Sequence, residues 1–228
     1  MQINYNYKTY EDRLREQYQA YNQVIEKRAT KSILSTAVDL FDQQQYDLCL
    51  KISDELEKTA TTEKDLYDAK KLIALCHYAK HDTANSDAAF YDLTRNSKNS
   101  DDWFNATIAA ALNENYERSE ELFDEAFKVH AEFGTAKNMP PVQLIFHYML
   151  TLQQNEVTEL AYDKFNMLRQ VYEQLKSNSD QDLTSKGLYP ISEFLEHARE
   201  TLIKSDQKDV KKMLDKFKTK VNERNALV

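Results

Sequence analysis

Residues 103–126 read WFNATIAAALNENYERSEELFDEA, and this stretch decides the fold. Its first half, from Trp103 to Leu112, is apolar on almost every side. A polar break follows at Asn113–Asn115, and the second half then carries its apolar side chains on one face only. This change across so short a break predicts two antiparallel helices that pack against each other.

The same arrangement of apolar, polar and small residues occurs three more times along the chain. Each copy has an apolar first segment, a short polar break and a more one-sided second segment. The other copies begin near Ile33, Ile73 and Ile145, with breaks at Asp42–Gln45, Lys80–Thr83 and Gln153–Val157. The sequence therefore predicts four helix pairs in succession.

Each copy also places a small residue early in its second helix, where it allows two helix axes to approach closely. Bulky side chains such as Phe90, Phe123 and Phe165 fill the space beside these positions. The small residues are Cys49, Ser86, Ser119 and Ala161, at intervals of 37, 33 and 42 residues. Recurrence at such intervals is typical of stacked helix pairs.

With small and aromatic residues at this spacing, the chain resembles the tetratricopeptide-repeat family. The resemblance covers about residues 31–170, and residues 103–126 match best. The glycine and closing proline that are usual in the family are absent from the first three copies. The resemblance implies helix-turn-helix units stacked side by side into a superhelix.

We therefore predict an all-α fold, an α-solenoid of about ten or eleven helices in antiparallel pairs with extra helices at both ends. Only two glycines and three prolines occur in 228 residues, which is too few for many strands or hairpins. Residues 1–30 are expected to form a helix that packs on the repeats. Residues 31–176 hold about four helix pairs, and 177–228 form C-terminal helices as a candidate cap.

Glycine and proline mark the expected helix boundaries. Gly134 is expected to end a helix through a left-handed cap. Pro140 and Pro141 are expected to open the next helix, because proline is tolerated in a first helical turn. Residues Ser177–Lys186 are the best linker candidate, and Pro190 suits the start of a helix that runs to about Lys204.

Charge is distributed unevenly over the chain, whose formal net charge is −8. Residues 1–31 carry +2 and residues 204–228 carry +4, so residues 32–203 carry −14. An acidic body disfavours binding to nucleic acid and anionic membranes.

No leader-like start or long apolar window is present, which favours a cytoplasmic protein. Cys49 and Cys76 lie in apolar helical stretches and indicate core residues of a reducing compartment rather than a disulfide.

The sequence offers little catalytic chemistry. With Gly134 and Gly187 as the only glycines, no phosphate-binding loop, dinucleotide fingerprint or nucleophile elbow is present. His77 and His81 have the spacing at which two imidazoles share a metal. No glutamate base lies between them, however, and His81 falls at a helix end beside Asp82, where capping is ordinary. We therefore expect no enzyme activity, no cofactor and no metal.

In the resembled family the first helices line a concave groove that holds the ligand. The matching positions here carry seven apolar side chains and one lysine, and burying each apolar side chain contributes roughly 1.5–3 kcal/mol. A groove of this composition should not stand empty in water. The predicted groove residues are Leu34, Val38, Lys71, Leu75, Phe104, Ile108, Phe146 and Leu150.

Three occupants of this groove stay open: the chain's own terminal helices, a second copy of the chain, or a foreign amphipathic helix or apolar peptide. We predict a non-catalytic protein-interaction module (an adaptor, assembly chaperone or complex subunit) that its acidic body steers toward a basic partner. One alternative is a structural homodimer with a self-filled groove. The other is attachment to nucleic acid or a membrane through the basic helix expected at about Gln207–Arg224.

Overall fold

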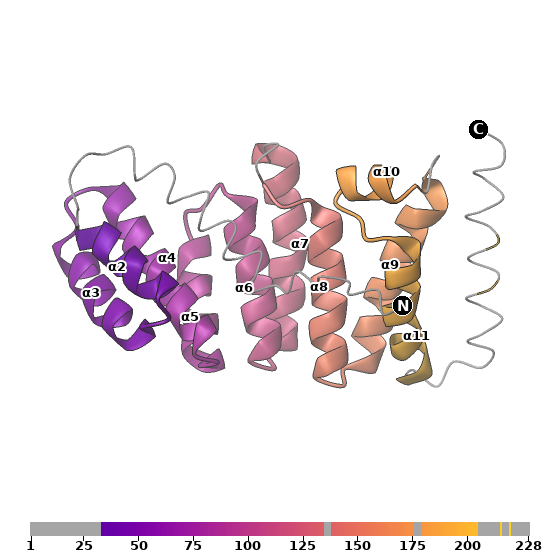
Figure 1. Ribbon diagram of the computed structural model, residues 1–228, viewed down its shortest axis with the longest axis horizontal. Helices are drawn as coiled ribbons and strands as arrows, with labels where there is room; N and C mark the ends of the chain where they lie inside the picture. The colour runs from indigo at the N-terminus through magenta and orange to yellow at the C-terminus, as the bar shows by residue number, and fades with distance from the viewer. Residues whose placement is uncertain (1–32, 135–137, 176–178, 205–214, 216–218, 220–228) are drawn as a thin grey trace. The chain divides into compact units, whose positions relative to one another are not determined.

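The computed structural model describes residues 33–134, 138–175 and 179–204, together with residues 215 and 219 (Figure 1). The described residues form ten helices and no strand, so the predicted all-α fold is confirmed for this part of the chain. The helix expected at 1–30 lies outside the described residues, as does nearly all of the expected basic helix 207–224.

The chain divides into two compact units, with the boundary between Asn96 and Ser97. This boundary falls inside the predicted repeat region 31–176, and nothing in the sequence indicated it. The described part of the first unit, residues 33–96, contains four helices, and neighbouring helices pack against each other. In addition, α2 packs against α4, so the leading helices of the two pairs are in contact. The helices are α2 (Ile33–Asp42), α3 (Tyr46–Thr59), α4 (Glu63–Ala79) and α5 (Thr83–Thr94).

The second unit repeats this arrangement and extends it. Its first four helices form two packed pairs, and the leading helices α6 and α8 contact each other (Figure 1). The last helix, α11, packs against α9. The helices are α6 (Ser100–Leu112), α7 (Tyr116–Phe133), α8 (Pro141–Gln154), α9 (Thr158–Gln174), α10 (Asp180–Ser185) and α11 (Ile191–Lys204).

The turn inside each of the four helix pairs has the same backbone hydrogen bonds. In the turn between α6 and α7, the N–H of Glu114 donates to Ala111 O and that of Asn115 donates to Ala110 O. These two bonds define a helix end in which the residue just before the last donor, here Glu114, adopts a left-handed conformation. The left-handed residues are Gln44, His81, Glu114 and Glu156, with φ between 58° and 62°.

The four left-handed residues follow one another at the same intervals as the predicted small residues. In each pair the small residue lies five positions after the left-handed one, and it is fully or almost fully buried. Because these side chains are small, the second helix lies close against its neighbours at this point. The predicted succession of four helix–turn–helix pairs therefore matches four turns with one geometry.

Two boundary predictions are confirmed. Helix α8 begins at Pro141 with Pro140 as its N-cap. Helix α11 begins immediately after Pro190, whose carbonyl accepts a hydrogen bond from Phe194 N at 3.0 Å. Proline fits both places because a first-turn N–H has no partner inside the helix.

The prediction of a left-handed cap at Gly134 is wrong. Helix α7 does end there, but Gly134 has φ −57° and ψ 142°, so the chain leaves the helix in an extended conformation. A Cβ atom at this position would lie 2.2 Å from the carbonyl oxygen of His130. Glycine is therefore required by close contact with the preceding helical turn rather than by its freedom at positive φ.

The prediction of a linker at Ser177–Lys186 is wrong for Asp180–Ser185, which form helix α10, while residues 177 and 178 lie outside the described residues. The end of α10 repeats the turn motif of the four pairs, with Gly187 N donating to Thr184 O and Leu188 N to Leu183 O. Here the left-handed residue is a glycine, with φ 75°. A Cβ at Gly187 would also meet Pro140 at 2.6 Å, so this glycine serves both conformation and packing.

Candidate peptide-binding surface

The structure buries most of the predicted groove residues. Among the eight, Leu34, Lys71 and Leu150 are half-buried and keep some surface. The other five are Val38, Leu75, Phe104, Ile108 and Phe146, each with 4% or less of its surface exposed. The peptide-binding role of the eight stays a prediction, and only the half-buried three are placed to touch a ligand without a rearrangement.

Phe104 shows how the second unit fills its own interior. The ring of Phe104 on α6 stacks on that of His130 on α7, with 6.3 Å between ring centroids. The Nδ1 atom of His130 also lies 3.2 Å from the hydroxyl of Ser100, in the first turn of α6. Asn138 donates to that hydroxyl at 2.6 Å. These contacts join the start of α6 to the end of α7 and to the segment before α8.

Phe146 on α8 is covered by the C-terminal part of the same chain. Its ring centroid lies 4.2 Å from that of Tyr189. The ring of His197 on α11 meets it edge-on at 5.5 Å. This predicted groove position is therefore filled by residues that follow the predicted repeat region.

The C-terminal segment is held in this place by aromatic packing and by hydrogen bonds. Phe194 on α11 stacks on Tyr172 and Phe165 of α9, at centroid distances of 4.5 and 5.8 Å. The hydroxyl of Tyr172 donates to the backbone oxygen of Tyr189 at 2.8 Å. Burial raises the pKa of Tyr172 above its usual range, because the phenolate would lose its hydration. The hydroxyl thus remains a donor in this bond.

Lys71 is the one charged residue of the predicted groove. Its Nζ atom lies 3.2 Å from the hydroxyl of Tyr67, one helical turn earlier on α4. It also lies 5.5 Å from the centroid of the same ring. A half-buried ammonium group beside an aromatic ring offers a ligand both a charge and an apolar surface.

A buried lysine at Lys164 was not predicted. Its Nζ atom pairs with Glu120 at 2.7 Å and lies 4.3 Å from the ring of Phe123 and 5.3 Å from that of Tyr148. Tyr148 hydrogen-bonds in turn to the small-position residue Ser119. The ammonium thus ties α9 to both α7 and α8. The signal in the sequence is a lysine between Ala161 and Leu168 on the apolar stripe of α9.

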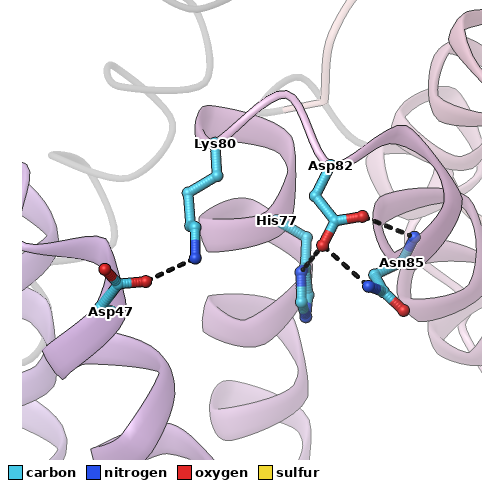
Figure 2. A network of polar contacts seen from close by, with 5 residues as sticks. All are labelled: Asp47, His77, Lys80, Asp82 and Asn85. Atoms are coloured by element: carbon cyan, nitrogen blue, oxygen red, sulfur yellow. Dashed lines mark hydrogen bonds and ion pairs between the residues drawn. The ribbon is translucent and has the colours of Figure 1, made fainter.

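The predicted His77–His81 pair has a capping geometry. His77 Nδ1 lies 3.0 Å from the carboxylate of Asp82, and Asn85 donates to that carboxylate at 2.8 Å (Figure 2). These hydrogen bonds, with the side chain of Asn85 contributing most, lower the pKa of Asp82. His81 is exposed at the left-handed turn position. Within the described residues, no group of three His, Cys, Asp or Glu side chains is arranged to hold a metal ion.

The hydrogen bond between Ser100 and His130 has the components of a nucleophile and base. Ser100 has no exposed surface, however, and its oxygen accepts from Asn138. A nucleophile must reach its substrate in a near-attack geometry. The arrangement therefore serves to join helices rather than to present a reactive hydroxyl.

Comparisons with protein-family models, with curated proteins and with solved structures found no match for this chain. The resemblance to the tetratricopeptide-repeat family consequently stays a prediction that depends on the residues quoted above. Among the described helices, none combines the length and the apolar character needed to cross a membrane.

Proposed function

We propose that this protein is a non-catalytic interaction module, an α-solenoid of stacked helix pairs that binds another polypeptide as an adaptor, assembly chaperone or complex subunit. The observation that carries the proposal is the turn that recurs four times with the same hydrogen bonds and the same small buried residue five positions later. Units of one supersecondary type bury their apolar faces by stacking on their neighbours.

The contacts between leading helices support this proposal within each unit. α2 packs against α4, and α6 packs against α8, so successive pairs place their first helices side by side. Helices arranged in this way present a continuous surface along the stack, which is how repeat proteins form extended binding surfaces. The proposed surface consists of the half-buried Leu34 and Lys71 in the first unit and of the half-buried Leu150 in the second unit.

The charge of the chain favours a basic partner. Residues 32–203 carry a formal charge of −14, which attracts cationic segments and raises their rate of encounter. Within each unit a half-buried leucine, Leu34 in the first and Leu150 in the second, would receive an apolar anchor of an amphipathic helix or an extended peptide. We therefore propose a basic amphipathic helix as the ligand class.

The test is a selection from a library of basic amphipathic helical peptides, followed by fluorescence anisotropy with the selected peptide. Leu34→Glu and Leu150→Glu should each weaken binding about tenfold or more, because each places a charge where an apolar contact of roughly 1.5–3 kcal/mol is expected. The matched control is Leu48→Glu, since Leu48 is an exposed leucine on α3, a second helix of its pair. Equal losses in all three variants, or a library without binders, would contradict the proposal.

Phe104 and Ile108 are unsuitable for this test although both were predicted to line the groove. Their exposed fractions are 0% and 2%, so a polar substitution would unfold α6 from α7 before it changed any binding surface. Circular dichroism of each variant should therefore accompany every affinity, and only variants with an unchanged spectrum are compared.

The cover over Phe146 favours a second candidate, a structural role in which the chain fills its own groove at the C-terminal end. Tyr189 and His197 occupy the place that a ligand side chain would take beside this ring. If the chain fills its own groove, Tyr189→Ala should lower stability without creating a peptide site. If the protein binds a foreign peptide, the same change should strengthen peptide binding near Leu150.

A further inference from the structure

The two cysteines of the chain lie on neighbouring antiparallel helices. Cys49 is in the first turn of α3 and Cys76 is in the last turn of α4, and these helices pack against each other. Both side chains have no exposed surface, and both are free thiols.

Two ion pairs fix the register of α3 against α4. Asp47 of α3 pairs with Lys80, the C-cap of α4, at 2.5 Å (Figure 2). Nearer the connection between the helices, Glu57 lies 3.9 Å from Lys70. A step forward along α3 corresponds to a step backward along α4 when two helices are antiparallel. By this register residue 78 lies level with Cys49, so Cys76 is offset from Cys49 by two positions, or about 3 Å along the helix.

The two buried thiols affect each other's ionisation. Cys76 is the main cause of the lowered pKa of Cys49, and Cys49 is the main cause of the raised pKa of Cys76. The hydroxyl of Ser53, one turn further along α3, lies 3.9 Å from the sulfur of Cys49 and supports its thiolate. The two thiols are thus unequal, and Cys49 is the one that loses its proton more readily.

Packing alone does not require a thiol at residue 49. The equivalent small positions of the other three pairs carry Ser86, Ser119 and Ala161, all of them buried. A small side chain of any kind therefore satisfies the close approach of the helices. The first pair differs in having a cysteine there, with a second cysteine on the neighbouring helix α4.

We propose that Cys49 and Cys76 form an oxidation site at which a peroxide closes an intramolecular disulfide between α3 and α4. The Cys49 thiolate attacks one oxygen of the peroxide, the O–O bond breaks, and hydroxide leaves with Cys49 as a sulfenic acid. The sulfur of Cys76 then attacks the sulfur of Cys49, loses its proton, and releases water as the S–S bond forms. The two thiols give up two electrons, and the peroxide accepts them.

The burial of both sulfurs determines the rate at which hydrogen peroxide oxidises them. Hydrogen peroxide reaches them only when α3 and α4 separate locally, so the reaction should be slow in the native protein. Concentrations of urea below the unfolding transition should accelerate it, because they raise the population of the opened state. A thiol reductant should restore the reduced chain.

The experiment treats the full-length chain with hydrogen peroxide and measures its intact mass after quenching with an alkylating reagent. The expected product is a monomer that has lost two hydrogen atoms, takes up no alkyl group and regains the original mass with reductant. Peptide mapping should find the segments of Cys49 and Cys76 linked. Cys49→Ser and Cys76→Ser should each abolish this product, and Cys49→Ala and Cys76→Ala serve where a serine disturbs the fold.

The methionines provide an internal control for peroxide exposure, since each gains one oxygen when oxidised. An intact mass that shows methionine oxidation but no loss of two hydrogens would overturn the proposal. Cys49 that stops at the sulfenic or sulfinic acid, a disulfide between two chains, or a disulfide that forms only in fully unfolding urea would overturn it equally.

Discussion

The four left-handed turn residues carry side chains that are unfavourable in that conformation. Gln44, His81, Glu114 and Glu156 each have a Cβ that approaches the following carbonyl when φ is positive. The end of α10 has the same motif with Gly187, which avoids that contact. The four pairs therefore retain local strain that the surrounding hydrogen bonds and packing overcome.

Replacing one of these residues by glycine should stabilise the protein. We expect Glu114→Gly to raise the free energy of unfolding by about 0.5–1 kcal/mol, because relief of strain exceeds the added entropy of the unfolded chain. Urea unfolding followed by circular dichroism measures this. The matched control is Asp124→Gly, at an exposed position within α7, which should lower stability by about 1 kcal/mol. Equal destabilisation by both changes would contradict the explanation.

Asp68 on α4 is a second residue in an unfavourable environment, because its carboxyl group is buried. It is 2% exposed, and within the described part of the chain neither carboxylate oxygen has a hydrogen-bond partner. Burial raises the pKa of Asp68 to about 6, although the nearby charge of Lys71 opposes this. The folded protein therefore binds this proton more tightly than the unfolded chain does, and it loses stability as the pH rises through about 6.

The Asp68→Asn variant removes this dependence. At pH 8 we expect the variant to be more stable than the parent by about 3 kcal/mol, since the pKa rises from 3.8 to about 6 and each pKa unit corresponds to about 1.4 kcal/mol. Below pH 4 the advantage should shrink, because Asp68 of the parent is then neutral in both states. Urea unfolding at the two pH values checks this, with Asp124→Asn as an exposed control. A stability difference that is independent of pH would contradict it.

At the scale of helices, the small buried residues set how closely the second helix of each pair packs. Ala161 on α9 is 1% exposed, five positions after the left-handed Glu156. On the same stripe lie Lys164, Phe165 and Leu168, all buried. There is consequently no room for a larger side chain at residue 161 unless α9 moves away from its neighbours.

Ala161→Leu should destabilise the second unit by about 1–3 kcal/mol or more, because the added atoms overfill a packed interior. Ala88→Leu is the control, since Ala88 is exposed in the middle of α5 and leucine is also a good helix former. Thermal unfolding compares the two variants. Tolerance of leucine at both positions would show that the small residues do not determine helix spacing.

The individual helices also show which of their boundaries a sequence pattern predicts. The helix pairs, their breaks and the openings at Pro141 and Ile191 were predictable because apolar periodicity and proline act locally. The left-handed cap at Gly134 was mispredicted, because the same glycine signal also arises from a steric contact with His130. The four turns that do contain left-handed residues use Gln, His and Glu, which give no turn signal in a sequence.

At the scale of the whole molecule, the boundary at Asn96 separates two compact units. The N-terminus of α6 is capped by residues that lie on the same side of that boundary as the helix itself. The hydroxyl of Ser97 donates to Asp102 at 2.6 Å, and the indole of Trp103 donates to Ser97 O at 3.0 Å. The side chain of Asn99 caps the helix by accepting from Asp101 N.

A fragment of residues 97–228 should therefore fold by itself. We expect a helical circular dichroism spectrum and a cooperative thermal transition, because the cap of α6 and both helix pairs remain intact. The comparison is a fragment that begins after Asn115, which separates α7 from its partner α6 and should lose cooperativity. A fragment 97–228 without a cooperative transition would show that the first unit is required for folding of the second.

For the candidate binding surface, prediction from sequence succeeded less well. The eight positions followed from the resemblance, but their exposure depends on what packs over them. Phe146 is covered by Tyr189 and His197, which lie more than forty residues later in the chain. A single sequence does not encode such a long-range contact in any periodic pattern, so only the structure separates Leu34, Lys71 and Leu150 from the buried five.

The sequence by itself determined that the described part of the chain is helical, where the breaks inside its helix pairs fall, and which small residues lie at the close approaches, because each of these depends on neighbours a few positions away. The tertiary structure decided what burial does to those residues. It packed the helix of Cys76 against that of Cys49, closed aromatic rings around Lys164, and left Asp68 without a hydrogen-bond partner in the described residues. These outcomes depend on helices that meet in space, and free energies of desolvation and pairing arise only when they do.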